Sequence, residues 1–105
     1  MGQGDLVASS KQLTIPDAAL RDQKSYEIAR VWVVEKAEHV SLRTGNWDDP
    51  VARGIVLADL ARHVANGYEQ DKGLDKAETL LRIRSAILAE IEDPTDNPTG
   101  TLLTM

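Results

Sequence analysis

The stretch YEIARVWVVEKAEHVSLR, residues 26–43, decides the fold of this chain. Apolar and polar side chains alternate on both sides of a short polar segment, a pattern that predicts two antiparallel strands joined by a tight turn. With residues 35–38 as the turn, Val33 lies opposite Val40. One face of the hairpin is then aliphatic, and we expect it to point inward. A shift of one residue would set valines against polar side chains, so the pattern specifies which residues share a face.

The opposite face of the hairpin carries Arg30, Trp32, His39 and Arg43. The predicted register makes the two arginines neighbours. A tryptophan flanked by arginines is typical of a protein-binding hot spot, and also of a base-stacking platform with phosphate contacts. The structural alternative is that the N-terminal segment or a helix covers Trp32 and that glutamates pair with the arginines. These four residues are candidate binding residues.

Two long helices are predicted after the hairpin. The first, over residues 50–72, begins at an Asp-Pro pair and ends before Gly73, a natural helix end. Asp75 with Glu78 forms an aspartate version of the capping box, so a second helix is predicted over residues 76–92. Apolar residues recur at helical spacing and cover about half of each circumference. One hairpin cannot bury both faces, and we therefore expect a homodimer.

The predicted fold class is α+β, with an antiparallel β-hairpin packed against two long antiparallel α-helices in a single domain over residues 13–93. Residues 1–12 are expected to be a mobile segment, and residues 94–105 a flexible tail. A two-stranded sheet alone is marginal in water. Either Leu13–Ile15 adds a third short strand, or a second copy of the chain extends the sheet.

The composition argues against several classes of function. The chain has 105 residues, a net charge of −5 and no cysteine, which excludes disulfides, thiolate nucleophiles and Cys-based metal sites. The negative charge argues against nucleic acid and anionic membranes as partners. The sequence shows neither a run of about 18 apolar residues nor a basic leader, so we expect a cytoplasmic protein. Aromatic residues are few, and no cofactor is expected.

Four segments, Arg30–Trp32, Val40–Leu42, Trp47–Pro50 and Leu57–Tyr68, together resemble a family of short bacterial proteins defined only as a domain of unknown function. The resemblance covers roughly residues 13–92, and LADLARHVANGY is its most specific part. It implies a compact α+β domain that stands alone in a short bacterial protein. It implies no activity, so no catalytic or ligand residue can be carried over.

Asp59 and His63 lie one turn apart on the first predicted helix, a spacing at which a carboxylate can orient an imidazole as a general base. The plainer interpretation is a solvated helix face with a modest ion pair. A catalytic metal would need a third ligand, and no metal site is expected. The pair is a weak candidate for the catalytic residues of a hydrolase-type enzyme.

Arg84 lies near the centre of the apolar stripe of the second predicted helix. A buried guanidinium without a partner is costly, so three arrangements are open. In the first, the aliphatic stem of Arg84 packs while its guanidinium reaches water. In the second, the guanidinium forms an ion pair with a carboxylate of the same or a second chain, such as Asp49, Asp59 or Glu27. In the third, it binds an anion. We include Arg84 among the candidate binding residues.

The leading hypothesis for function is a small, non-catalytic, cytoplasmic module that acts as a homodimer and binds another protein. The alternative is a binding module for a small anionic ligand, held by the arginines or by His39. The third is the hydrolase-type enzyme. The chain has no Gly-rich phosphate loop and no nucleophile elbow, and this absence favours binding over catalysis.

Overall fold

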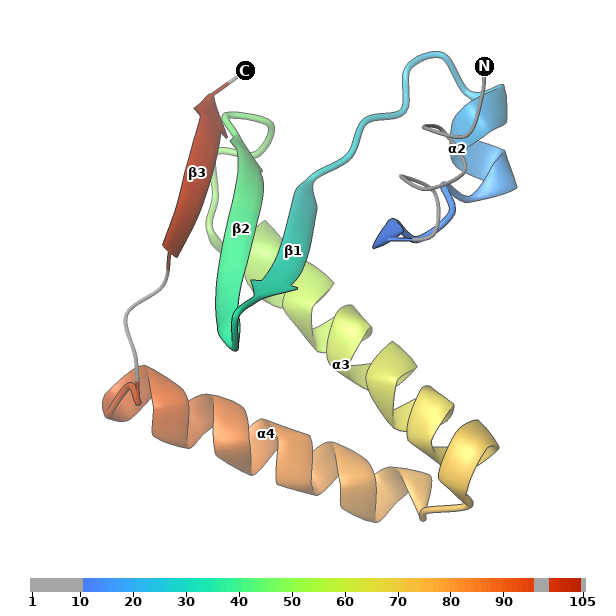
Figure 1. Ribbon diagram of the computed structural model, residues 1–105, viewed down its shortest axis with the longest axis vertical. Coiled ribbons are helices and arrows are strands. Elements are labelled where there is room, and N and C mark those ends of the chain that lie inside the picture. The colour runs from blue at the N-terminus through green and yellow to red at the C-terminus, as the bar shows by residue number, and fades with distance from the viewer. Residues whose placement is uncertain (1–10, 96–98, 105) are drawn as a thin grey trace.

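The computed structural model describes residues 11–95 and 99–104. In chain order the elements are α2 (Asp17–Arg21), β1 (Ala29–Val34), β2 (Ala37–Thr44), α3 (Val51–Lys72), α4 (Lys76–Glu92) and β3 (Thr99–Thr104). The fold is α+β, as predicted: a three-stranded sheet beside two helices that diverge from their connection (Figure 1). The mobile segment expected over residues 1–12 falls almost wholly outside the described residues.

The turn of the hairpin consists of only two residues, Glu35 and Lys36, whose φ angles are 52° and 69°. Positive φ at both positions is the conformation of a type I′ turn, whose twist matches that of paired strands. Val33 therefore lies opposite Glu38 and not Val40, so the predicted register was wrong by two residues. The prediction of which residues share a face was right, because a shift of two preserves the alternation.

The third strand comes from the C-terminal end of the chain. β3 pairs with β2 in parallel, giving the order β1-β2-β3. The flexible tail expected over residues 94–105 thus contains a strand, while Leu13–Ile15, the other candidate, forms no strand and joins no sheet. Two strands that pair in parallel need a long connection between them, and α3 and α4 form the connection between β2 and β3. This pairing leaves β1 as an edge strand.

The two long helices begin and end within one residue of their predicted bounds. The Gly73 N–H donates to the Glu69 carbonyl at 3.0 Å with φ at 69°, which closes α3 in the left-handed conformation that glycine adopts easily. The Asp75 carboxylate accepts from the Glu78 N–H at 2.9 Å and caps α4. Neither α3 nor α4, nor the short helix α2, is long and apolar enough to cross a membrane.

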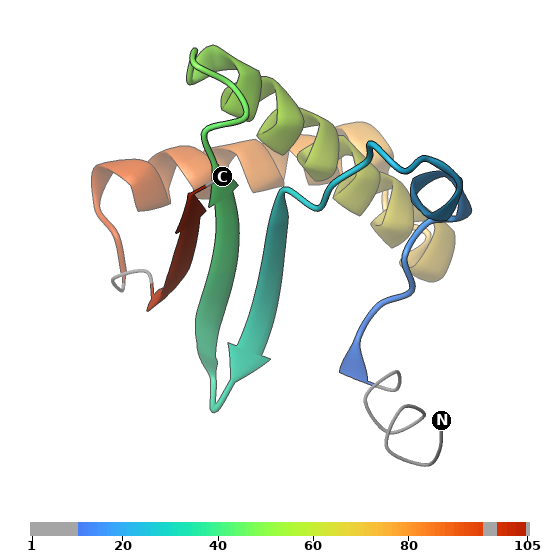
Figure 2. The same ribbon diagram turned by 90° about the horizontal axis from the view of Figure 1, so that it is seen from above.

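A single chain has almost no core. Among residues 11–95 only Ala65 is buried, and Val31 and Val33 are 59% and 73% exposed. Close backbone contacts stay within each layer, between neighbouring strands or between α3 and α4. In Figure 2 the turn end of the hairpin projects away from the helices. The aliphatic face of the hairpin is therefore not turned into a core as predicted, because Val31 and Val33 are exposed and Val40 is only half-buried.

Candidate functional site

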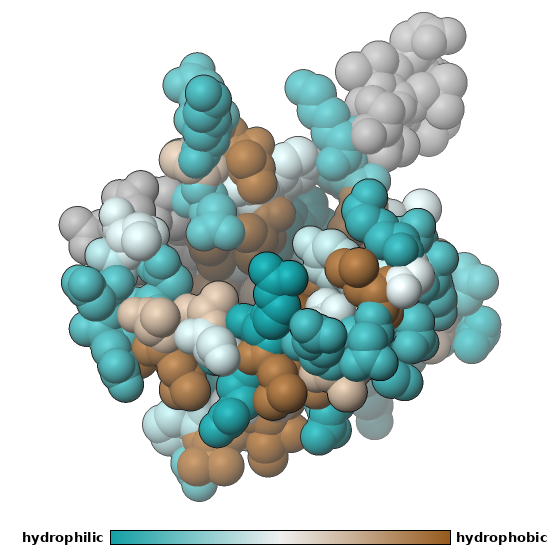
Figure 3. Space-filling model, turned by 90° about the horizontal axis from the view of Figure 1, so that it is seen from below, coloured by the Kyte–Doolittle hydropathy of each residue, from teal (hydrophilic) through white to brown (hydrophobic). Residues whose placement is uncertain are grey.

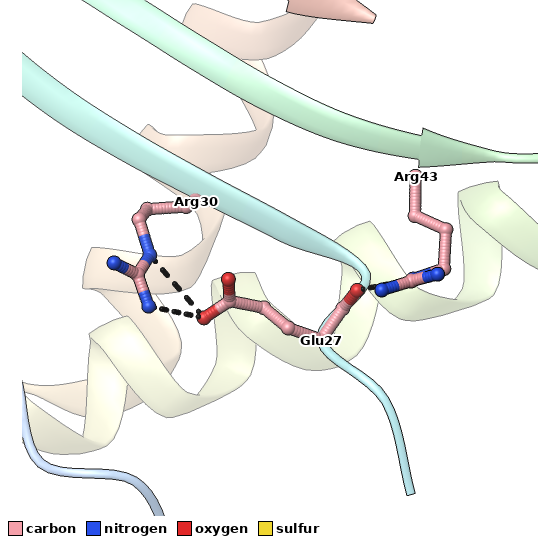
Figure 4. Close-up of polar contacts among 3 residues, drawn as sticks. All are labelled: Glu27, Arg30 and Arg43. Carbon is pink, nitrogen blue, oxygen red and sulfur yellow. Dashed lines mark hydrogen bonds and ion pairs between the residues drawn. The ribbon is translucent and has the colours of Figure 1, made fainter. Parts of the chain in front are cut away.

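Glu27, in the segment before β1, holds both arginines of the hairpin (Figure 4). Its carboxylate accepts from Nη2 of Arg30 at 3.0 Å and from Nε at 3.3 Å. Its backbone carbonyl accepts from Nε of Arg43 at 2.8 Å. The Arg43 guanidinium also lies over the ring of Tyr26, 5.4 Å from its centroid. Arg30 is thus paired with a glutamate, as one of the alternatives from the sequence had it, whereas Arg43 is bonded to a backbone carbonyl.

The four hairpin candidates share one side of the sheet, which we call the Arg–Trp face (Arg30, Trp32, His39 and Arg43). Trp32 lies directly opposite His39, and Arg30 lies opposite Ser41 and not Arg43. Trp32 is half-buried and His39 is exposed. The face combines a large aromatic ring with Arg30, whose charge the Glu27 carboxylate offsets, and with Arg43, which is bonded to a neutral carbonyl.

A cavity of about 660 Å³ lies beside β1. Residues 11–16 and α2 line one side, and residues 29–32 of β1, with Arg30 and Trp32 among them, line the other. Its volume is in the range of small-molecule sites. His39 and Arg43 are not part of its lining, so it joins only two of the four candidates on the Arg–Trp face.

Asp59 and His63 are both exposed on α3. No ion pair joins them, and neither lines the cavity beside β1 or the smaller hollow of about 210 Å³ near the end of α3. Within residues 11–95 and 99–104, no three side chains of the metal-ligating types gather in one place. The geometry therefore gives this pair no substrate pocket and no third ligand.

Arg84 is exposed on α4, away from the other candidates. It forms no ion pair with any carboxylate in the described part of its own chain. Of the three arrangements considered for it, pairing within one chain is excluded for Asp49, Asp59 and Glu27. Its side chain is exposed to solvent in the middle of an apolar stripe.

Sequence reasoning missed Arg53, in the first turn of α3. Its Nη2 donates to the backbone carbonyl of Arg43 and to Oδ1 of Asn46, the latter at 2.7 Å. Its guanidinium lies 5.0 Å from the ring centroid of Trp47. Arg53 therefore ties the start of α3 to the end of β2. One arginine on a helix carries no such signal in the sequence; only the tryptophan just before the helix could have drawn attention to it.

Comparisons with known proteins agree with this fold. A solved structure described as a "putative pyruvate dehydrogenase from the photosynthetic bacterium Rhodopseudomonas palustrus CGA009" is 29% identical, with a TM-score of 0.71 over 85% of this chain and 91% of that chain. None of the curated proteins matches. The model of the family described as Domain of unknown function (DUF5076) matches residues 12–95. The resemblance found in the sequence is therefore confirmed, and this chain belongs to the DUF5076 family.

Proposed function

We propose that this protein is a small interaction module that works as a homodimer and binds another protein through the Arg–Trp face. The observation that carries the proposal is the missing core. Apart from Ala65, no residue within 11–95 is buried, and large apolar side chains are exposed on the helices and on β1. A chain in this state gains most of its stability from surfaces that another chain covers.

The exposed area supports the same proposal. The whole chain, with its terminal segments, exposes 9359 Å². A monomeric protein of this size exposes about 5,800 Å². The difference, about 3,500 Å² for one chain, exceeds the roughly 1,000–2,500 Å² that each partner buries in an obligate interface. Figure 3 looks onto the side where α4 lies and shows apolar side chains gathered in patches there. The Cα radius of gyration, 16.2 Å, also exceeds the value of about 13 Å for a compact domain of this length.

The Arg–Trp face supports the part of the proposal that concerns a second protein. His39 on this face is exposed, and Arg30, Trp32 and Arg43 keep part of their surface accessible to a partner. Glu27 already offsets much of the positive charge of Arg30. A protein surface with an apolar centre and an acidic or carbonyl-rich rim would match it.

The experiment compares Trp32→Ala with Val34→Ala, a change on the same face nearer the turn. Each tagged protein is cross-linked in cells and its partners are identified by mass spectrometry. We expect one partner with the wild type and with Val34→Ala, and its loss with Trp32→Ala, all compared at a protein concentration at which light scattering reports a dimer for each variant. A partner retained equally by Trp32→Ala would contradict the role of this face.

A second candidate function is suggested by the cavity beside β1, which Lys11 and Arg30 line. It would hold a small anionic ligand such as a carboxylate or phosphate. We place it second because Glu27 already engages Arg30. Thermal shift with inorganic phosphate and with pyruvate tests it, since a bound ligand at a hundred times its Kd stabilises by about 2.7 kcal/mol. No shift with either compound at millimolar concentration would exclude it for these anions.

We do not extend the pyruvate dehydrogenase description of the similar structure to this chain. Oxidative decarboxylation of a 2-oxo acid needs a cofactor that acts as an electron sink, together with groups that bind and orient it. The described residues offer neither a cluster of metal-ligating side chains nor a polar group from the Asp59 and His63 pair in the cavity. The cytoplasmic location, the lack of a cofactor and the argument against nucleic acid stay predictions from composition.

A further inference from the structure

The outer edge of β1 has free backbone groups. In an antiparallel pair, residues alternate between those bonded to the partner strand and those that point away from it. The Arg43 N–H donates to the Ile28 carbonyl at 2.9 Å, which fixes the phase of this alternation. The N–H and C=O groups of Ala29, Val31 and Val33 therefore point away from β2. No backbone hydrogen bond from another described residue reaches them.

This edge is unusually unprotected for a strand of six residues. Natural sheets protect their edges with charged side chains, prolines or bulges. β1 reads ARVWVV, with one charged residue, no proline and continuous pairing to β2. The cavity of about 660 Å³ runs along the same edge, because four consecutive residues, 29–32, line it. Residues 11–16 and α2 of the same chain line the far side of this space, so a strand added to β1 would lie between them and β1.

We propose that β1 of a second copy of this chain pairs antiparallel with β1 across a two-fold axis at Val31, joining two three-stranded sheets into one of six strands. This inference rests on the homodimer in the proposed function and names its interface. In this dimer the Arg–Trp face of each copy stays uncovered. Both copies present this face on the same side of the joined sheet.

The backbone selects this register. With Val31 opposite Val31 of the second copy, Ala29 lies opposite Val33 of that copy and Val33 opposite its Ala29. All the outward backbone groups of these three residues then find partners. A shift of two residues in either direction leaves some of them unpaired, and an unmade hydrogen bond to a buried backbone group is costly.

The side chains favour the same register. On the aliphatic face, Val31 meets its own counterpart, and Val33 meets an alanine, which covers the two valines that are 59% and 73% exposed in one chain. On the Arg–Trp face, Arg30 lies opposite Trp32 of the second copy, a pairing of cation with aromatic ring. A shift that sets Arg30 against itself would place like charges opposite each other.

A second copy also explains the segment across the cavity. Leu13 is 95% exposed and Leu20 is 66% exposed, although both line the cavity. Neither contacts β1 closely enough to protect its edge by backbone pairing. With a second β1 in the space between, these leucines would lie against the other copy. Burial of these leucines against the second copy would be favourable through the hydrophobic effect.

The absence of cysteine from the chain makes the register directly testable. Four single variants are compared: Arg30→Cys, Val31→Cys, Trp32→Cys and Val33→Cys. Each of these residues faces its own counterpart in a different register. In the proposed register the two Cα atoms of residue 31 are about 5.5 Å apart, within reach of a disulfide. Those of residue 33 are about 13 Å apart, which is too far.

We expect mild oxidation to convert Val31→Cys to a covalent dimer and to leave Val33→Cys, its matched control on the same face, largely uncross-linked. Preferential cross-linking at residue 30, 32 or 33 would overturn the register. A dimer by light scattering with no cross-link at any of the four positions would overturn β1 as the interface while leaving the proposed function intact. A monomeric wild type would overturn both.

Hydrogen exchange of the unmodified protein gives a readout that needs no variant. The amide of Val31 points outward, so in a single chain it exchanges rapidly. In the proposed dimer it exchanges as slowly as the amide of Trp32, which bonds to β2. Rapid exchange at Val31 in a protein that light scattering shows to be dimeric would contradict the pairing of the two β1 strands.

Discussion

Thermal unfolding of this protein should depend on its concentration if, as we propose, a chain that buries only Ala65 among residues 11–95 folds stably by association. The perturbation is dilution alone. If each folded dimer unfolds to two separate chains, the melting temperature Tm falls as the protein is diluted. A self-contained monomer would show no such change.

The size of the effect follows from chain length. Globular proteins unfold with about 0.7 kcal/mol of enthalpy per residue near 60 °C, so two chains of 105 residues unfold with about 150 kcal/mol. For a dimer that dissociates as it unfolds, the change in 1/Tm is R times the logarithm of the dilution, divided by that enthalpy. A hundredfold dilution then lowers Tm by about 7 °C.

The assay is circular dichroism at a helix-sensitive wavelength, with protein at about 1 and 100 μM, beside light scattering at the same concentrations. The disulfide-linked Val31→Cys dimer is the internal control, because its two chains cannot separate and its Tm should not respond to dilution. A wild-type Tm that stays constant within about 1 °C over this range, with the mass of a monomer, would refute the reasoning.

Three further predictions concern the hairpin turn, the Arg53 contacts and the cap of α4. Each is measured by urea unfolding at one fixed protein concentration. Replacing Glu35 and Lys36 by Asn-Gly should stabilise the protein by about 1 kcal/mol, because both positions have positive φ; a loss would show that the turn is not of this type. Arg53→Met should cost about 2 kcal/mol, since it removes two hydrogen bonds and the ring contact, whereas Arg62→Met, exposed on the same helix, should change stability by less than about 0.5 kcal/mol. Equal effects of these two would contradict the role of Arg53. Asp75→Ala should cost about 1 kcal/mol through the lost helix cap, and an unchanged midpoint would speak against it.

The features that the sequence predicted well depend on near neighbours. Gly73 ends α3 and Asp75 begins α4 through contacts within one helical turn. Such contacts can be predicted from a few consecutive residues of the sequence. The sharing of faces in the hairpin also follows from alternation alone. The binding candidates Arg30, Trp32 and Arg43 could therefore be placed together on one face before any register was known.

The candidate site was predicted less well than the fold class. The sequence could not show that Glu27 accepts hydrogen bonds from two arginines, through its carboxylate and through its backbone carbonyl. That arrangement depends on how the segment before β1 bends. It gave no sign of Arg53, whose partners come from β2 and from the loop that follows. The cavity beside β1 was also invisible, since α2 reaches that place only through the path of an irregular connection.

The sequence by itself determined the strands of the hairpin, the two helices with their caps, and the sorting of residues between the two faces of the sheet. These depend on backbone geometry and on contacts a few residues apart. Only the tertiary structure decided the register, the choice of Thr99–Thr104 as third strand, and the exposure of the aliphatic face. The register depends on a turn of two residues whose side chains do not reveal positive φ. The third strand pairs with a segment far away in the chain, and burial depends on what other surfaces are present to cover a face.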